Sequence, residues 1–153
     1  MKKYFALFFA LFFTAITNAQ QKTLVFDHEK IFTPTELIRL DRMLQEYRKS
    51  TGRIVLINTD TLDVSNGAYA DNLVNQFVTD ITNKPFIFML LLSRKNQLIL
   101  ASVNDQVKPY IKEKTLFEIL DAGIPSFKVK RPAEGSTLIC KKAMKFLNIL
   151  SDK

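Results

Sequence analysis

Four polar side chains stand where they could hold a hard metal ion. Asp80 and Asn83 precede the most apolar run of the chain, and Asn104 and Asp105 follow the next apolar run. Carboxylate and amide oxygens are the ligands that Ca²⁺ and Mg²⁺ prefer. The same residue types also end helices and form turns without metal, and Lys84 would place a positive charge among the four. A divalent-cation site and a set of turn residues are therefore both open.

A second group of polar residues follows another apolar run, Arg53 to Thr59. Asp60 and Asp63 come directly after it, and Arg94 follows Ser93 in the reversal after the central run. Ligands of open α/β sheets bind outside the carboxyl ends of parallel strands, so a binding site here is one interpretation. Helix capping or a turn explains the two aspartates equally well.

The sequence offers few residues for other kinds of catalysis. His28 is the only histidine, so we expect a surface or capping role for it, and Cys140 is the only cysteine. The register of Cys140 with Met144 and Leu147 predicts a buried thiol in the last helix. None of the four glycines forms a phosphate-binding motif. Any phosphatase activity would therefore need a bound metal that polarises a phosphoryl oxygen and activates water.

The elements that position these groups follow from the apolar pattern. Phe86 to Ser93 is apolar until its last residue, which predicts a strand covered on both faces. A short reversal returns the chain, so Leu98 to Val103 should pair with it in antiparallel fashion. Arg53 to Thr59, a helix over 68–81 and the central strand predict a right-handed βαβ unit. The first polar group should then lie at one end of the sheet and the second at the other.

The remaining segments predict further helices on both faces of this sheet. Thr33 begins a capping box with Glu36, and Gly52 is placed to end the helix that follows. The other expected elements are a short strand at Thr23 to Phe26, a helix over Val107 to Ala122, a connection over Ile124 to Phe127 and a last helix from Pro132. The predicted fold is a three-layer α/β/α sandwich with a mixed, mostly parallel sheet and one antiparallel hairpin strand.

The beginning of the chain resembles a signal peptide. Residues 1–19 combine Lys2 and Lys3, an apolar stretch and a small-residue end at Ala19, so we expect residues 20–153 to form one exported domain, periplasmic or extracellular. The apolar stretch is shorter than the roughly 20 residues of a membrane-spanning helix, so no stable span is expected in the mature chain. Loss of both lysines lowers the formal charge from +7 to +5.

The basic residues are spread along the chain, which speaks against nucleic acid as a partner. Their denser groups predict solvated faces or, as the alternative, a surface that binds an anionic envelope. These groups consist of Lys128, Lys130 and Arg131, and of Lys141, Lys142 and Lys145.

The chain resembles the TPM-domain family, small exported α/β domains of which some members are described as acid phosphatases or divalent-metal binders. The resemblance covers nearly all of the mature chain and rests on the order of several segments. They are Val25-Phe26-Asp27, Ile31-Phe32-Thr33, Glu36 with Leu40 and Leu44, Thr51 to Val55, Tyr69 to Leu73, Phe88 to Ser93, Ile124 to Phe127 and Glu134 to Leu138.

Two glycine motifs of that family are absent from this sequence. Asn83-Lys84-Pro85 stands where the family has Asp-Asn-Gly, and Val103 to Gln106 stands where it has Gly-Tyr-Gly. The resemblance implies that metal binding belongs to this region. We therefore expect a non-catalytic, monomeric domain that binds Ca²⁺ or Mg²⁺ weakly or not at all and acts through a protein or envelope partner. The alternative is a metal-dependent phosphatase acting on phosphomonoesters.

Overall fold

Four strands form an open sheet with helices on both faces. The computed structural model describes residues 22–60, 67–79 and 85–150. The strands β1 (Val25–Asp27), β2 (Ile54–Thr59), β3 (Ile87–Ser93) and β4 (Leu98–Val103) lie side by side in sequence order. The first three are parallel and β4 is antiparallel to β3. This arrangement confirms the predicted α/β sandwich with one antiparallel hairpin strand.

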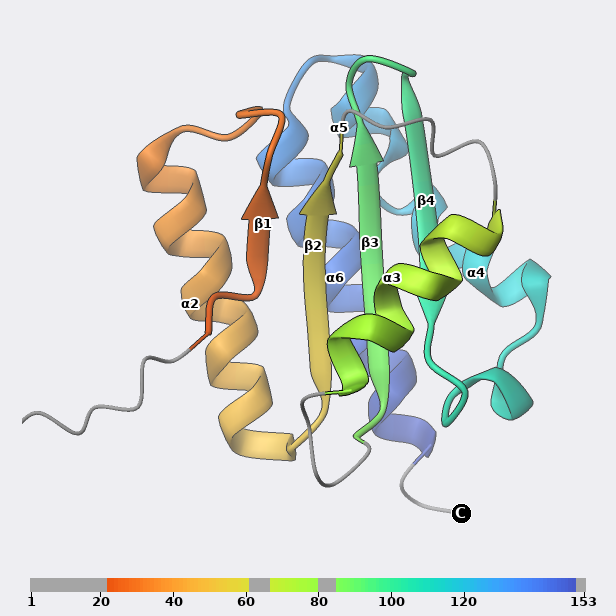
Figure 1. Ribbon diagram of the computed structural model, residues 1–153. Helices are drawn as coiled ribbons and strands as arrows, with labels where there is room; N and C mark the ends of the chain where they lie inside the picture. Colours follow the sequence, from red (N-terminus) through yellow and green to blue (C-terminus); the bar gives the residue numbers. More distant parts are fainter. Residues whose placement is uncertain (1–21, 61–66, 80–84, 151–153) are drawn as a thin grey trace, which may run out of the picture.

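Helices cover the two faces of the sheet unequally (Figure 1). Of the helices in the described residues, α3 (Gly67–Thr79) is the one on the near face, where it lies against β3 and β4. On the far face α2 (Pro34–Thr51) and α6 (Pro132–Ile149) contact each other and the central strands, and α4 (Glu113–Asp121) contacts β4 and α6. In Figure 1, β2 and β3 point upward, α3 lies in front of the sheet and β3 lies to the right of β2, so the connection through α3 is right-handed, as predicted.

The central strand is buried on both faces, as its composition predicts. All seven residues of β3 are buried, and so are all six of β2. Phe88 and Leu90 in β3 have no exposed surface. Burial of side chains of this size contributes about 1.5–3 kcal/mol each. Because both strands are apolar on both sides, helices must cover both faces.

Helix α2 begins and ends where the sequence predicts. The Thr33 hydroxyl accepts a hydrogen bond from the Glu36 N–H, and the Glu36 carboxylate accepts one from the Thr33 N–H at 2.8 Å. Gly52 follows the helix with φ of 71°, a left-handed conformation that glycine adopts without steric cost. The N–H of Gly52 donates to the Arg48 carbonyl at 2.8 Å and closes the last turn.

The structure corrects two segments after the hairpin. The predicted helix over Val107 to Ala122 is wrong, because the chain forms a 3₁₀ turn, η1 (Lys108–Tyr110), and then α4. Ile111 and Lys112 between them are extended, so the single turn that Pro109 begins cannot continue. The predicted connection over Ile124 to Phe127 lies in a short helix, α5 (Ile124–Lys128).

Close packing explains why α5 is helical rather than a loose connection. Gly123, just before α5, lies so near α6 that a Cβ there would stand 2.5 Å from the Gly135 carbonyl oxygen. Pro125 also favours helical geometry in the first turn. The sequence shows the two glycines but not that they meet, so this helix depends on tertiary contact.

Some of the remaining predictions concern described residues and are tested by the structure, and others concern residues outside that part of the chain. Cys140 is completely buried and His28 is exposed, as predicted. No helix within residues 22–60, 67–79 and 85–150 is long and apolar enough to cross a membrane. The expected signal peptide, residues 1–19, lies outside the described residues, as do Asp63, Asp80 and Asn83.

Candidate functional site

The strand directions separate the polar loops into two groups, as predicted. β2 and β3 end together, and the Asp60 N–H donates to the Leu92 carbonyl at 3.1 Å. β4 runs back, so Asn104 and Asp105 lie at the opposite end of the sheet, where β3 begins. Figure 1 shows the first group at the upper end of the sheet and the second at the lower end.

Asn104 is a buried residue that joins the end of β4 to the start of β3. Its side chain is 2 % exposed. The Asn104 Oδ1 accepts from the Ile87 N–H at 3.0 Å, and its Nδ2 donates to the Pro85 carbonyl at 2.8 Å. Its backbone carbonyl accepts from the N–H groups of Val107 and Lys108 at 2.9 and 3.1 Å. Both polar atoms of the amide are thus engaged in shaping the turn.

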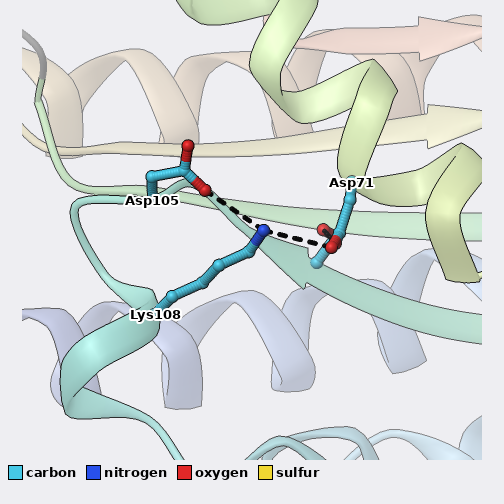
Figure 2. Close-up of polar contacts among 4 residues, drawn as sticks. Asp71, Asp105 and Lys108 are labelled. Carbon is cyan, nitrogen blue, oxygen red and sulfur yellow. Dashed lines mark hydrogen bonds and ion pairs between the residues drawn. The ribbon is translucent and has the colours of Figure 1, made fainter.

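A lysine bridges two carboxylates beside this turn (Figure 2). The Lys108 Nζ lies 3.1 Å from an Asp71 oxygen and 3.1 Å from an Asp105 oxygen. Asp71 comes from α3, Asp105 from the end of β4 and Lys108 from η1. The Ser102 hydroxyl of β4 also donates to the Asp71 Oδ1, at 2.6 Å. We call Asp71, Ser102, Asp105 and Lys108 the lysine-bridged cluster.

Asp71 and Lys108 each favour the ionised state of the other. Burial acts to raise the pKa of Asp71, but the hydrogen bonds from Ser102 and Lys108 and the charge of Lys108 outweigh it, so the pKa is lowered. The hydrogen bonds to Asp71 and then to Asp105 raise the pKa of Lys108. Asp71, Lys108 and Asp105 are 46, 42 and 71 % exposed, so solvent weakens these attractions.

The Lys108 ammonium group occupies the position between Asp71 and Asp105 that a bound cation would take. Asp71 and Asp105 could hold a divalent ion together only if Lys108 moved away, because both already contact its Nζ. The part of the chain that the structure describes contains no group of three or more histidine, cysteine, aspartate or glutamate residues suited to a metal. Of the four predicted ligands, Asn104 and Asp105 lie together here.

Sequence reasoning missed Asp71 and Lys108. Ser102 carries the signal that could have found Asp71, since a polar residue near the end of a mostly apolar strand needs a partner when it is buried. Ser102 is 3 % exposed and its partner is Asp71. Lys108 stands three residues after Asp105, a spacing at which the two side chains meet on a tight turn.

Carboxylates at the upper end of the sheet mostly hold backbone groups. Asp27 accepts from the N–H groups of Ile31 and Phe32, each at 3.0 Å. Glu29 accepts from the N–H groups of Arg94 and Lys95 in the β3–β4 turn. These contacts tie the backbone of the β3–β4 turn to the loop that follows β1.

Asp60 accepts a hydrogen bond from the Tyr69 hydroxyl of α3. Burial, followed by this hydrogen bond and the charge of Asp60, raises the pKa of Tyr69 to about 12. Asp60 and His28 both line a cavity of about 300 Å³ between β2 and α3. The predicted binding site at Asp60 and Asp63 stays a prediction, since Asp63 is outside the described residues.

The fold and the lysine-bridged cluster define an exposed polar site on a small α/β sandwich. The family model of the TPM domain matches residues 25–146, so the chain belongs to the TPM-domain family. This membership confirms the resemblance drawn from the sequence segments. No curated protein matches the chain.

Several solved structures share the fold, among them the following three. The N-terminal domain of a protein from P. gingivalis has a TM-score of 0.69 and 18 % identity, with 85 % of each chain covered. The BA42 protein of the psychrophilic bacterium Bizionia argentinensis has a TM-score of 0.66 and 13 % identity over 78 % of this chain and 83 % of that one. The N-terminal domain of cg2496 from Corynebacterium glutamicum has a TM-score of 0.58 and 10 % identity, covering 86 and 84 %.

Proposed function

We propose that this protein is an exported TPM domain that has no catalytic role and acts by binding a protein or envelope partner as a monomer. In this proposal it binds Ca²⁺ or Mg²⁺ weakly or not at all. The signal-like residues 1–19 support export, and the two missing glycine motifs support the loss of tight metal binding. The observation that carries the proposal is the position of the Lys108 ammonium between Asp71 and Asp105.

The lysine changes the electrostatics of cation binding at this end of the sheet. A divalent ion entering the cluster would have to displace Lys108 or lie beside its positive charge. At about 4 Å, two unit charges interact by about 1 kcal/mol in water and by more at a partly buried surface. Asn104 offers little compensation, because its oxygen already accepts from the Ile87 N–H in a buried position. Weak binding or none is the expected result.

The competing function is a metal-dependent phosphatase with Asp80, Asn83 and Asp105 as ligands. Metal, when bound, would polarise a phosphoryl oxygen and activate water. The chain would then have to supply at least one free carboxylate to the ion, and Asp105 is ion-paired with Lys108. Its high exposure leaves room for that pair to open, so activity has to be measured directly.

A metal titration followed by amide NMR tests the proposal. We compare the mature protein with Lys108→Met, which keeps the apolar stem and removes the charge, and with Lys112→Met as a control on the neighbouring surface. Ca²⁺ and Mg²⁺ are titrated separately, and the amides of Asp71, Asn104 and Asp105 are followed. Lys108→Met should bind calcium about tenfold more tightly than the unchanged protein, whereas Lys112→Met should behave like the unchanged protein.

Two results would overturn the proposed function. One is micromolar calcium binding by the unchanged protein that Lys108→Met does not improve. The other is metal-dependent hydrolysis of a phosphomonoester such as p-nitrophenyl phosphate by the purified mature protein, abolished by Asp105→Ala. The second result would establish the phosphatase function instead.

A further inference from the structure

A groove lies between the amino-terminal halves of α2 and α6. The two helices meet through their carboxyl-terminal halves, where the Tyr47 hydroxyl of α2 donates to the Asn148 Oδ1 at 3.0 Å. Toward their beginnings they leave a concavity of about 660 Å³. This volume lies within the range of 300–1,000 Å³ typical of ligand pockets. The groove is on the far face of the sheet from α3 and is separate from the lysine-bridged cluster.

Basic side chains outnumber acidic ones around the groove. Arg39 comes from α2, Lys130 and Arg131 from the segment before α6, and Lys141 from α6 itself, against only Glu36 and Glu134. These four cations come from separate elements and surround one concavity, although the sequence spreads them over a hundred residues. The groove therefore carries a positive charge that the sequence alone does not show.

Both acidic residues already have partners. The Glu36 carboxylate accepts from the N–H and the hydroxyl of Thr33 in the capping box, each at 2.8 Å. Glu134 pairs with Arg131 at 3.5 Å. Across residues 22–60, 67–79 and 85–150, no ion pair involves the other three cations of the groove, Arg39, Lys130 and Lys141. The four cations and two carboxylates give the groove a net charge of +2, and Arg39, Lys130 and Lys141 can approach an external anion without breaking an ion pair between described residues.

The floor of the groove is apolar, which limits what the anion can be. Leu40, Met43 and Leu138 line it, and Leu138 is 42 % exposed although it lies in the middle of α6. A flat lipid surface would meet the charged groups first, and its acyl chains would have to leave the bilayer to contact the apolar lining of the concavity. A side chain from a peptide could reach it. A second copy of this chain is disfavoured by the net charge of +5 that is left when Lys2 and Lys3 are subtracted from the +7 of the full sequence.

We infer that the α2–α6 groove binds an acidic peptide segment of a partner protein, with an aliphatic or aromatic side chain on Leu138 and Met43 and carboxylates against Arg39, Lys130 and Lys141. Charge complementarity selects an acidic partner, and the apolar floor selects a segment that also carries a large apolar side chain. This inference rests on the proposed function, since it names the class of partner through which the domain acts.

A synthetic peptide tests the inference with the mature protein. The probe is a short capped peptide in which glutamate pairs alternate with leucines. One control peptide has every leucine replaced by serine, and another has every glutamate replaced by lysine. Binding is followed by amide NMR and by fluorescence anisotropy of the labelled peptide at low and at physiological salt. We expect the amides of Met43, Lys130 and Leu138 to shift only with the glutamate–leucine peptide, and the affinity to fall as salt rises.

Substitutions test the contributions of the charged residues and of the apolar lining to peptide binding separately. The double variant Arg39→Glu and Lys141→Glu should weaken peptide binding at least about tenfold, because it reverses two charges of the rim. Leu138→Ala should weaken it about threefold to tenfold, because it removes apolar surface that the peptide would bury. Lys112→Glu reverses a charge that does not line the groove and should leave the affinity within about twofold of the unchanged value.

Several outcomes would overturn the inference. One is equal binding of the serine and leucine peptides, which would reduce the groove to an unspecific basic patch. Another is binding to phosphatidylglycerol vesicles that the double variant abolishes and Leu138→Ala leaves unchanged, without any peptide binding. The absence of peptide binding even at low salt would also overturn it. In that case the metal titration of Lys108→Met would still test the proposed function separately, because neither the double variant nor Leu138→Ala changes the lysine-bridged cluster.

Discussion

Replacement of Asn104 by alanine should destabilise the protein strongly even when no metal is present. The change removes two hydrogen bonds, from the Ile87 N–H at 3.0 Å and to the Pro85 carbonyl at 2.8 Å. Each contributes about 1 kcal/mol, and the Ile87 N–H, buried at the start of β3, is left without a partner at a further cost of about 1–3 kcal/mol. The free energy of unfolding should fall by about 3 kcal/mol.

Urea denaturation in EDTA measures this loss. With an m value of about 1.5 kcal/mol/M, the midpoint should fall by about 2 M urea, and m should stay constant if only the native state changes. Asp105→Ala is the matched control, because its side chain is 71 % exposed and its ion pair with Lys108 contributes about 0.5 kcal/mol or less. The two neighbouring positions should therefore differ by about 2 kcal/mol or more.

A third substitution separates the structural role of Asn104 from a role as metal ligand. Asn104→Asp keeps an oxygen for the Ile87 N–H but turns a second oxygen, instead of an N–H donor, toward the Pro85 carbonyl. The structural role predicts a less stable protein, whereas a ligand role predicts tighter calcium binding because a carboxylate replaces an amide. A loss below about 1 kcal/mol for Asn104→Ala in EDTA, with a larger loss only in calcium, would refute our reasoning.

Three further predictions concern other parts of the molecule. The lowered pKa of Asp71 means that its contribution is complete above its ordinary value of 3.8 and disappears as the pH falls through the lowered value; Asp71→Asn should cost about 0.5 kcal/mol in urea denaturation at pH 7, and this cost should shrink as the pH is lowered below 3.8. The Cys140 thiol, whose pKa burial raises to about 12, should react with Ellman's reagent only after unfolding, so rapid labelling of the native protein would contradict its burial. Gly52→Ala should cost about 1 kcal/mol, because Cβ is strained at φ of 71°, and Gly52→Asn should cost less; equal stability of all three proteins would contradict the left-handed geometry.

Local signals predict much of this fold. The capping box of Thr33 and Glu36 and the terminal Gly52 define α2 because every contact they need lies within a few residues. The apolar runs of β2 and β3 predict burial on both faces, and the short reversal after Ser93 predicts the antiparallel β4. From these elements the sequence also predicts that Asp60 and Asn104 lie at opposite ends of the sheet.

Other features depend on contacts between distant segments and could not be predicted in this way. The helix α5 depends on the approach of Gly123 to Gly135. The division of the predicted third helix into η1 and α4 depends on the extended backbone at Ile111, which no local signal beyond Pro109 indicates. Asp71 and Ser102 are 31 residues apart, and their hydrogen bond exists because α3 packs against β4.

The sequence by itself determined the strand directions and predicted that the candidate ligands Asn104 and Asp105 lie together at one end of the sheet, because both depend on periodicity, spacing and local turns. Its segments also resemble those of the TPM-domain family, to which the chain belongs. Only the tertiary structure shows which groups the side chains of these candidate ligands contact. Asn104 points its amide into the backbone of β3, and Lys108 brings an ammonium group to Asp71 and Asp105 from another segment. An electrostatic environment is the sum over all charges near a point in space. It therefore appears only when the chain is folded.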